Sequence, residues 1–342
     1  PDYRLPKDVL QAEIDNIKRA GVEIKLNSKL GRDFTLDDLR NRDGFDAVVV
    51  AIGAHKDRRL GVEGEEREGV LSATGFLRDV ALGNALKMEG KRVAVVGGGD
   101  SAIDAARTSL RLGASEVHLV YRRTREEMPA LAEEVDAAEA EGIKMHFLAN
   151  PSAVLGNGRV EAMRCIRQVL GEFDDSGRRN PIPAPGTEFD LDVDVIIPAV
   201  GQVPDVSAVA CGGDPGGRAR NVAVDGTMMT SMPGVFAAGD AVSGAATVVE
   251  AVGQGNRVAV FVDAYLQGQL PAEDATWPDY RILDLTYEME EFAQVPRAKA
   301  VEMAVEERKS GFQEIELVLS EEAARKEARR CLRCDLERRN SQ

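Results

Sequence analysis

Three glycines between a hydrophobic strand and a helix carry the clearest chemistry in the sequence. In RVAVVGGGDSAIDAARTSLRL, Gly97, Gly99 and Ala102 form a G-x-G-x-x-A pattern. The first glycine permits a tight turn, the second lets the backbone approach a pyrophosphate, and the small third residue lets helix and strand pack closely. The helix N-terminus directs free N–H groups at the phosphates. We predict a dinucleotide site formed by Gly97, Gly98, Gly99, Asp100, Ser101 and Ala102, with Gly201 at the end of a later strand.

Two arginines predict which dinucleotide binds. An NAD site usually ends the second strand of this unit with an acidic residue for the ribose 2′-hydroxyl. Here Arg122 and Arg123 hold that place, about 25 residues after Gly97. Guanidinium groups suit a 2′-phosphate. We therefore predict NADP, and the alternative is that both arginines are solvated surface residues.

A second strand that ends in glycine and aspartate has a different chemistry. The strand in SMPGVFAAGD ends at Gly239 and Asp240, and a helix begins near Ala246 and Thr247. A carboxylate at this place can take the ribitol hydroxyls of a flavin. The helix N-terminus can stabilise negative charge on the reduced flavin ring. The alternative is a capped turn in which Asp240 is only the cap.

The hydrophobic pattern predicts the elements that position these residues. Residues 91–148 show three strand-like runs separated by two helical patterns, which predicts a βαβαβ unit with a parallel sheet. Turn signals between short strands predict an antiparallel excursion at about 152–192, and the run 193–201 closes the unit. A helix followed by a strand at 22–26 opens the chain, and the apolar run 46–54 suits a buried parallel strand. Residues after 270 are expected to be charged and extended, with a helical end.

Composition restricts the classes of partner. Lys and Arg total 43 and Asp and Glu total 58, for a net charge of −15. This acidic field argues against nucleic acid or an anionic membrane as the main partner. No apolar run approaches the roughly 18 residues of a membrane span. Because four cysteines in 342 residues make no disulfide framework, we expect a reducing cytoplasm.

Several segments resemble one group of flavoproteins. The segments are RLPKDVL (4–10), VVVAIGA (48–54), GGGDSA (97–102), PAVGQVPD (198–205) and GVFAAGD (234–240). They are similar, in this order, to segments of the glutamate synthase small subunit, of the flavin-bearing large subunit of bifurcating NADH-dependent ferredoxin:NADP oxidoreductases, and of the flavin–NADPH half of dihydropyrimidine dehydrogenase. The resemblance covers roughly residues 1–270.

The resemblance implies an α/β flavoprotein of the glutathione reductase type, with an NAD(P) domain inserted in a partial FAD domain. It implies an NAD(P)H-dependent FAD oxidoreductase in which NADP contacts the glycine loop and the arginine pair. FAD would contact Gly53, Gly239, Asp240, Ala246 and Thr247. The expected division is a partial FAD domain at 1–55, an NADP domain at 90–201, the C-terminal part of the FAD domain at 202–270, and a charged extension at 271–342.

Hydride transfer between nicotinamide C4 and flavin N5 needs stacking and orientation rather than an acid–base pair. We therefore expect no catalytic side chain. The three histidines, His55, His118 and His146, show no shared setting in the sequence, and surface or strand positions are expected for them.

The sequence departs from this family at its start. Family members carry a first G-x-G-x-x-G, for the FAD pyrophosphate, upstream of the RLPK segment, and this sequence begins at Pro1. We expect either a piece of a longer polypeptide or a second chain that supplies the first half of the FAD site.

Cys331 and Cys334 form a C-x-x-C in an arginine-rich tail. They are candidates for partial ligands of an iron–sulfur centre such as [4Fe–4S], completed by other segments, for a redox dithiol, or for no redox role. Similar tails in the family favour onward electron transfer to iron–sulfur centres or a redox partner subunit.

Two other functions are alternatives. A thioredoxin-reductase-like enzyme would carry a C-x-x-C inside the NADPH domain, and residues 91–201 contain only Cys165, which argues against it. A non-catalytic nucleotide-binding subunit would keep NADP without flavin.

Overall fold

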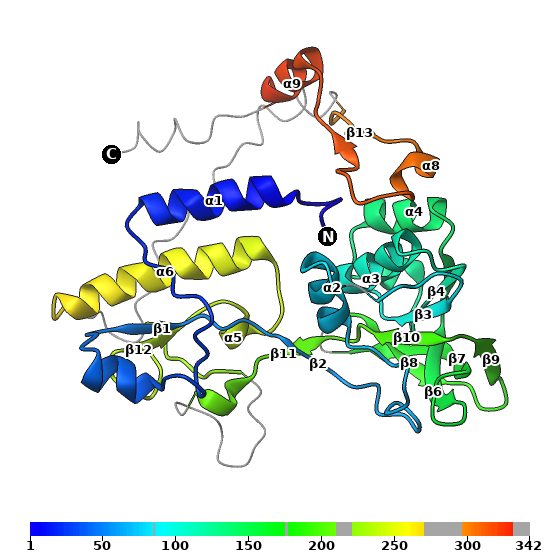
Figure 1. The fold of residues 1–342 in the computed structure, drawn as a ribbon, viewed down its shortest axis with the longest axis horizontal. Helices are drawn as coiled ribbons and strands as arrows, with labels where there is room; N and C mark the ends of the chain where they lie inside the picture. Colours follow the sequence, from blue (N-terminus) through cyan, green and yellow to red (C-terminus); the bar gives the residue numbers. More distant parts are fainter. Residues whose placement is uncertain (85, 175–176, 210–220, 270–295, 331–342) are drawn as a thin grey trace.

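The computed structural model describes residues 1–84, 86–174, 177–209, 221–269 and 296–330. These residues form two parts that lie side by side (Figure 1). The larger part contains two four-stranded sheets with helices α2, α3 and α4. The smaller part contains the strand pair β1–β12 with helices α1, α5 and α6. Two short antiparallel strands, β2 (Lys56–Asp57) and β11 (Gln202–Val203), connect the two parts.

A parallel sheet with the strand order β10-β3-β4-β5 is the centre of the larger part. Its strands are valine- and isoleucine-rich runs that are buried along nearly their whole length, as expected for a parallel sheet covered on both faces. The predicted βαβαβ unit and the closing strand are therefore confirmed. The elements are β3 (Arg92–Val96), α3 (Asp100–Arg111), β4 (Glu116–Val120), α4 (Ala132–Ala140), β5 (Lys144–His146) and β10 (Val195–Pro198), with α2 (Ala73–Ala81) packed on α3.

The predicted antiparallel excursion is present as the second sheet. Its central strand β7 is long and alternates buried and exposed residues, with Met163 and Cys165 in the core. This alternation buries one face against the parallel sheet and leaves the other in solvent. The excursion begins three residues earlier than expected, at Ala149. Its strands are β6 (Ala149–Leu155), β7 (Ala162–Phe173), β8 (Arg179–Pro183) and β9 (Phe189–Asp192).

The smaller part is built around two parallel strands from distant parts of the chain. Val48, Val49 and Val50 pair in register with residues 235–237. The elements are η1 (Asp38–Arg42), β1 (Val48–Val50), η3 (Val206–Ala208), β12 (Val235–Ala237), α5 (Asp240–Ser243) and α6 (Val248–Leu266). The four-residue helix α5 lies between β12 and α6.

Helix α1 (Lys7–Arg19) is present as predicted, but the strand expected at 22–26 is wrong. These residues are exposed and without regular structure. In the described part of the chain β1 pairs with β12 alone, so no strand edge receives residues 22–26. Helix α1 also buries none of its residues, and large apolar side chains on it and on α6 stay exposed: Val9, Leu10, Ile17, Val248, Val249 and Val252.

The helical end predicted for the C-terminal segment is confirmed as α9 (Glu321–Ala328). The rest of the described segment 296–330 is not simply extended, which corrects the expectation from its charge: it forms β13 (Val301–Glu302), α8 (Val305–Arg308) and β14 (Glu316–Leu317). It lies over α4 in Figure 1. The backbone N–H of Ile315 donates to the carbonyl oxygen of Tyr3 at 3.2 Å, and Arg308 pairs with Glu141 of the larger part. None of the described helices is long and apolar enough to span a membrane.

Candidate functional site

The glycine loop joins the end of β3 to the start of α3. Gly97 has φ of +147°, and a Cβ atom there would lie 2.3 Å from the carbonyl oxygen of Ala199, the residue after β10. The close approach of the neighbouring strand end therefore requires glycine. Ala102 is fully buried under this turn, which agrees with the small third residue of the pattern.

Gly99 is glycine for a different reason. It has extended backbone (φ −94°, ψ 176°) and is the N-cap residue of α3, without a side-chain cap. A Cβ atom there would meet nothing closer than a Pro129 carbon at 3.9 Å. The fold itself therefore has room for a side chain at Gly99. The free N–H groups of the first turn of α3 face this open position, which fits the phosphates of a dinucleotide.

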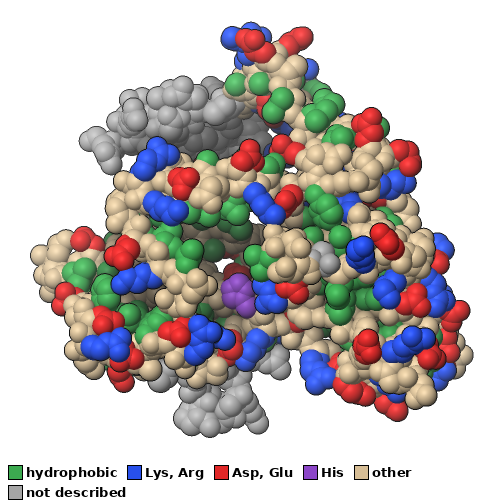
Figure 2. Space-filling model, in the orientation of Figure 1, with side chains coloured by type: hydrophobic (Ala, Val, Ile, Leu, Met, Phe, Trp, Pro, Cys, Tyr) green, Lys and Arg blue, Asp and Glu red, His purple; other side chains and the backbone are tan. Residues whose placement is uncertain are grey.

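A cavity of about 800 Å³ lies between the two parts of the molecule. Figure 2 shows the surface hollowed between them. The cavity brings the glycine loop, both predicted arginines and Gly201 together with Ala246, which precedes α6 of the smaller part. Of the predicted residues, Gly97, Gly98, Gly99, Asp100, Ser101, Arg122, Arg123, Gly201 and Ala246 line it.

The two arginines at the end of β4 have different surroundings. Arg122 is exposed, whereas the Arg123 side chain is 3% exposed and forms an ion pair with Asp174 at 2.6 Å. Arg123 Nε also donates to the carbonyl oxygen of Arg179 at 2.6 Å. The guanidinium of Arg123 is therefore bound to the β7–β8 hairpin, which the sequence did not indicate.

On the smaller part, the carboxyl ends of β1 and β12 meet because the two strands are parallel neighbours. Gly53 follows β1, and Gly239 and Asp240 follow β12; both glycines have positive φ, +67° and +69°. The backbone N–H of Gly239 donates to Oε1 of Gln254 at 2.7 Å, and Asp240 Oδ1 accepts the N–H of Ala246 at 3.3 Å. The turn before α6 is thereby held in place.

Helix α6 begins with a capping box between Thr247 and Glu250. Thr247 Oγ1 accepts the N–H of Glu250, and the Glu250 carboxylate accepts the N–H of Thr247 at 2.9 Å. The helix start predicted near Ala246 and Thr247 is confirmed. Thr247 acts as the cap of α6, so the part of this region that faces the cavity is Ala245–Ala246.

Cys165 is the one cysteine among the residues that the structure describes. Cys165 is buried in β7, and burial raises the pKa of its thiol to about 12, so it is an unreactive core residue. Among the described residues no group of three or more His, Cys, Asp or Glu side chains is placed to hold a metal ion. Cys211, Cys331 and Cys334 lie outside the described residues.

Two of the three histidines do share a setting, contrary to the expectation from the sequence. His118 on β4 and His146 on β5 lie on neighbouring strands, with Nδ1 of the first 2.8 Å from Nε2 of the second. Glu116 lies 3.2 Å from the other nitrogen of His118 and also pairs with Lys144. His118 is on the interior strand β4 and His146 on the edge strand β5, and neither is among the residues that line the cavity.

The histidine pair predicts a pH dependence of stability. Burial lowers the pKa of both rings, and the neighbouring positive charges of His118 and Arg167 further lower that of His146. The unfolded chain therefore binds more protons than the folded one below the ordinary histidine pKa of about 6.5. The free energy of unfolding should fall as the pH drops from 7 towards 5. Chemical denaturation at each pH measures this, and His146→Gln should flatten the dependence; an unchanged slope in that variant would contradict the assignment.

The structure also places residues in the cavity that the sequence did not indicate. Its wall includes Asp57 of β2, Arg58 and Arg59 directly after β2, and Arg178 in the turn between β7 and β8. The only sequence signal for Arg178 was the Gly177-Arg178-Arg179 run inside a predicted turn. A turn signal in the sequence does not indicate which part of the folded protein the turn contacts.

The sequence and the structure match known proteins. A family model described as pyridine nucleotide-disulphide oxidoreductase matches residues 5–255. The chain is 48% identical over 344 residues to the beta subunit of the NADP(+)-dependent formate dehydrogenase of Moorella thermoacetica, covering 98% of this chain and 48% of that protein. It is 36% identical over 276 residues to the small chain of the NADPH glutamate synthase of Escherichia coli K12, covering 76% of this chain and 58% of that protein.

A solved structure, FprA of Mycobacterium tuberculosis in complex with NADPH, matches with a TM-score of 0.58 and 20% identity. The match covers 72% of this chain and 69% of FprA. At this identity the likeness concerns the fold. The chain spans about half the length of the curated relatives it matches.

Proposed function

Because the chain belongs to the pyridine nucleotide-disulphide oxidoreductase family, we propose that it is the module that transfers hydride between NADPH and FAD. One observation carries this proposal. The glycine loop and Ala245–Ala246, directly before α6, where a flavin is expected, line the same cavity. Two nucleotides bound from these two sides would meet with their reactive rings between the two parts.

The family assignment confirms the recognised resemblance, the fold class and the oxidoreductase class. The family's pyridine nucleotide and flavin agree with the predicted cofactors NADP and FAD. We propose the division expected from the sequence, with the NADP domain at 90–201 and FAD-binding segments at 1–55 and 202–270. The βαβαβ unit and its antiparallel excursion support the first of these.

Each side of the cavity has a role in this proposal. The backbone of Gly97–Ser101 and the start of α3 hold the NADP pyrophosphate, and Arg122 attracts the 2′-phosphate. Gly53, Gly239 and Asp240 position the flavin, and the N-terminal end of α6 offsets negative charge near its ring. Bound FAD supplies N5 as the acceptor of the hydride from nicotinamide C4. The protein positions the two nucleotides and excludes water.

We propose that a further polypeptide segment completes the flavin side. The two parallel strands β1 and β12 that the described residues form here are too few for a stable sheet of this class. The exposed valines of α6, Val248 and Val249, are each 80% exposed and offer an apolar surface. A strand–glycine loop–helix segment with the first FAD fingerprint would fit this face.

We propose a redox partner for the electrons that leave the flavin, either a partner subunit or an iron–sulfur centre. The relatives are named as a beta subunit and a small chain, that is, as parts of larger enzymes. Cys331 and Cys334 remain candidate partial ligands. The low cysteine content, four in 342 residues, supports a reducing cytoplasm as the proposed location.

The test is an anaerobic visible spectrum of the protein with FAD, recorded before and after addition of NADPH, with NADH in parallel. Bleaching of a protein-bound flavin band by NADPH, faster than by NADH, is the expected result. The decisive comparison uses the protein together with the segment that completes its flavin side. If that protein binds NADPH but retains no flavin, the result would instead support a non-catalytic nucleotide-binding subunit.

A further inference from the structure

Helix α6 carries a glutamine at a position where an apolar residue is expected. Residues 254, 258, 261 and 265 share one face of the helix, because they recur at intervals of four, three and four. Val258 and Phe261 of this face are buried, and Tyr265 contacts Phe236 of β12 edge to face, with the ring centres 5.6 Å apart. This face therefore packs on β12, and Gln254 is its polar member.

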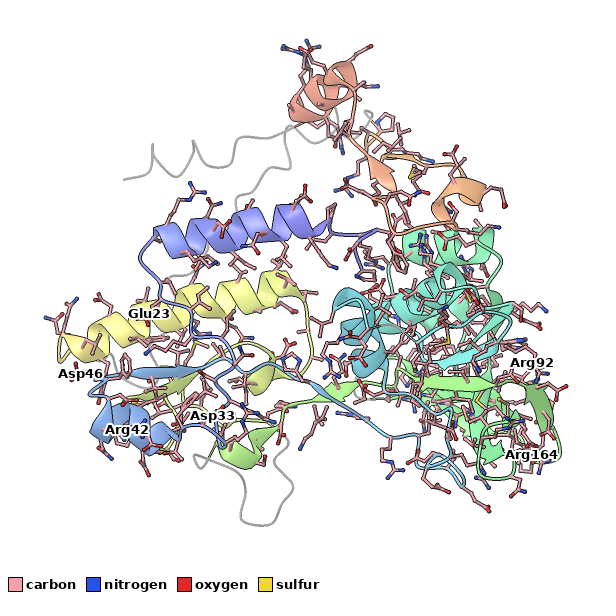
Figure 3. The ribbon with its side chains drawn as sticks, in the orientation of Figure 1. Glu23, Asp33, Arg42, Asp46, Arg92 and Arg164 are labelled. Atoms are coloured by element: carbon pink, nitrogen blue, oxygen red, sulfur yellow. The ribbon has the colours of Figure 1, made fainter. Side chains whose placement is uncertain are left out.

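The packing places Gln254 beside the carboxyl end of β12. A Cβ atom at Gly234, directly before β12, would lie 2.9 Å from the hydroxyl oxygen of Tyr265. At the other end, Oε1 of Gln254 accepts the backbone N–H of Gly239, after β12, at 2.7 Å. Helix α6 thus runs antiparallel to β12, along the strand pair seen in Figure 3. Because the Gly239 group is a donor, the amide oxygen of Gln254 must face it.

The Gly239 peptide depends on this contact more than its neighbours do. Gly239 has φ of +69° and ψ of −157°, which glycine alone adopts readily, and a Cβ atom there would meet nothing closer than 3.8 Å. On one side of it, the Ala238 N–H donates to the Val50 carbonyl oxygen at 3.1 Å. On the other side, the Ala241 carbonyl oxygen accepts the Val222 N–H at 2.8 Å. The glutamine side chain holds the flexible peptide between these two points.

The residue that follows this peptide is Asp240, whose side chain is half-buried. Its Oδ1 accepts the N–H of Ala246 at 3.3 Å, and Ala246 lines the cavity between the two parts. Its Oδ2 has no hydrogen-bond partner among the described residues. A carboxylate oxygen of this kind can accept a hydroxyl of the flavin ribitol. The direction of the carboxylate depends on the orientation of the Gly239 peptide, because the two residues are adjacent in the chain.

We propose that Gln254 is a positioning residue for the flavin: its amide oxygen fixes the Gly239 peptide and thereby directs the Asp240 carboxylate towards the ribitol hydroxyls. The proposal deepens the proposed function and rests on it. Gln254 takes no part in hydride transfer. A glutamine that only fastened α6 to β12 would affect stability and both nucleotides, whereas a positioning residue affects FAD alone.

The experiment measures the dissociation constants of FAD and NADPH for the protein together with the segment that completes its flavin side. Leucine in Gln254→Leu has a similar volume but accepts no hydrogen bond. This variant should bind FAD about 10-fold more weakly or worse and keep NADPH within about twofold. Glutamate in Gln254→Glu still accepts the Gly239 N–H and should bind FAD within about threefold of the unaltered protein, in high salt that screens the added charge.

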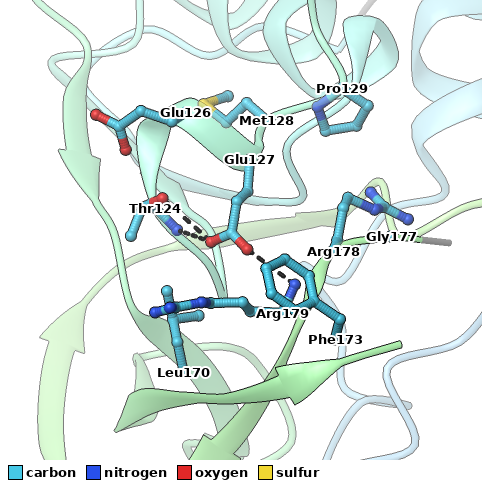
Figure 4. A pocket seen from close by; sticks show the side chains of 10 residues that line it. All are labelled: Thr124, Glu126, Glu127, Met128, Pro129, Leu170, Phe173, Gly177, Arg178 and Arg179. Atoms are coloured by element: carbon cyan, nitrogen blue, oxygen red, sulfur yellow. Dashed lines mark hydrogen bonds between the residues drawn. The ribbon is translucent and has the colours of Figure 1, made fainter. Parts of the chain in front are cut away.

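Two matched controls remove a hydrogen bond elsewhere. Gln267→Leu removes the amide bond to Asp263 Oδ2, 2.8 Å long, at the C-terminal end of the same helix. Thr124→Val removes the hydroxyl bond to the Glu127 carboxylate, 3.1 Å long, in the larger part (Figure 4). Both variants should keep the FAD affinity of the unaltered protein. Thermal unfolding without nucleotide establishes that each variant is folded, and Gln254→Ala replaces the leucine variant if that one does not fold.

Three results would overturn the role of Gln254. They are an unchanged FAD affinity in Gln254→Leu, an equal loss of FAD and NADPH in that variant, and a Gln254→Glu protein that binds FAD as weakly as Gln254→Leu does. Failure of the unaltered protein to bind FAD would instead overturn the proposed function itself.

Discussion

Replacement of Gly99 by valine is expected to weaken NADPH binding by about 100-fold or more while the protein stays folded. The reason is that the fold leaves the position open. A Cβ atom at Gly99 has no neighbour closer than 3.9 Å, and its backbone dihedral angles are accessible to any residue. The added side chain would occupy the space that the pyrophosphate needs above the first turn of α3. Binding is lost through steric exclusion of the ligand.

The neighbouring glycine provides the contrast. At Gly97 a Cβ atom would lie 2.3 Å from the carbonyl oxygen of Ala199, and φ is +147°. Gly97→Val should therefore lower the thermal stability of the nucleotide-free protein, whereas Gly99→Val should not. Thermal unfolding without nucleotide and a fluorescence titration with NADPH separate the two effects. Tight NADPH binding by a folded Gly99→Val protein would show that the nucleotide does not lie on this loop.

The sequence predicted correctly those parts of the fold where the local hydrophobic pattern favours the same secondary structure that the tertiary contacts stabilise. The runs that form β3, β4 and β10 are apolar throughout, because both faces of a parallel sheet are covered, and the glycine loop follows the first of them. The turn signals of the antiparallel excursion are likewise local features. The βαβαβ unit could therefore be placed to within a few residues.

Other features depend on partners that are distant in sequence. The strand expected at residues 22–26 lacks a neighbour to pair with in the described chain, so its β-propensity has no effect. Arg123 and Asp174 are 51 residues apart, and the sequence alone does not pair them. Two adjacent arginines had been expected to share one role, but the fold gives them different partners. The same holds for His118 and His146, which only the register of β4 and β5 brings together.

The cluster of buried charges around Glu141 is a further feature that the sequence did not indicate. Its disruption is the second change for which we expect a large effect, in this case on stability. Glu141 is at the C-terminal end of α4 with its side chain fully buried. It accepts hydrogen bonds from Arg107 and Arg111 of α3 and pairs with Arg308 of the C-terminal segment at 3.2 Å. Tyr3 covers the cluster, with the guanidinium carbon of Arg111 4.2 Å from its ring centre. Glu141 thus joins three separate segments of the chain.

Replacement of Glu141 by glutamine should lower the free energy of unfolding by about 3–5 kcal/mol, because it leaves the buried guanidinium of Arg111 without its counter-charge and removes one of the two carboxylates that pair with Arg107 and with Arg308. Chemical denaturation at pH 7 measures this loss. Glu139→Gln is the matched control on the same helix: its carboxylate pairs with Arg125 in a partly exposed position, where removal should cost at most about 1 kcal/mol. Equal losses in the two variants would show that the cluster adds nothing beyond a surface ion pair.

The pH dependence of this contribution has a definite sign. Burial alone would raise the pKa of Glu141, but hydrogen bonds from Arg111 and Arg107 hold it below its ordinary value. The stabilisation is therefore complete above the unfolded glutamate pKa of about 4.3 and is lost as the pH falls through the lower folded value. Limited proteolysis in this acid range should release the C-terminal segment 296–330 first, because Arg308 then loses its partner on α4. The same early cleavage should occur at pH 7 in Glu141→Gln, and resistance of the segment in that variant would mean that other contacts hold it to the larger part.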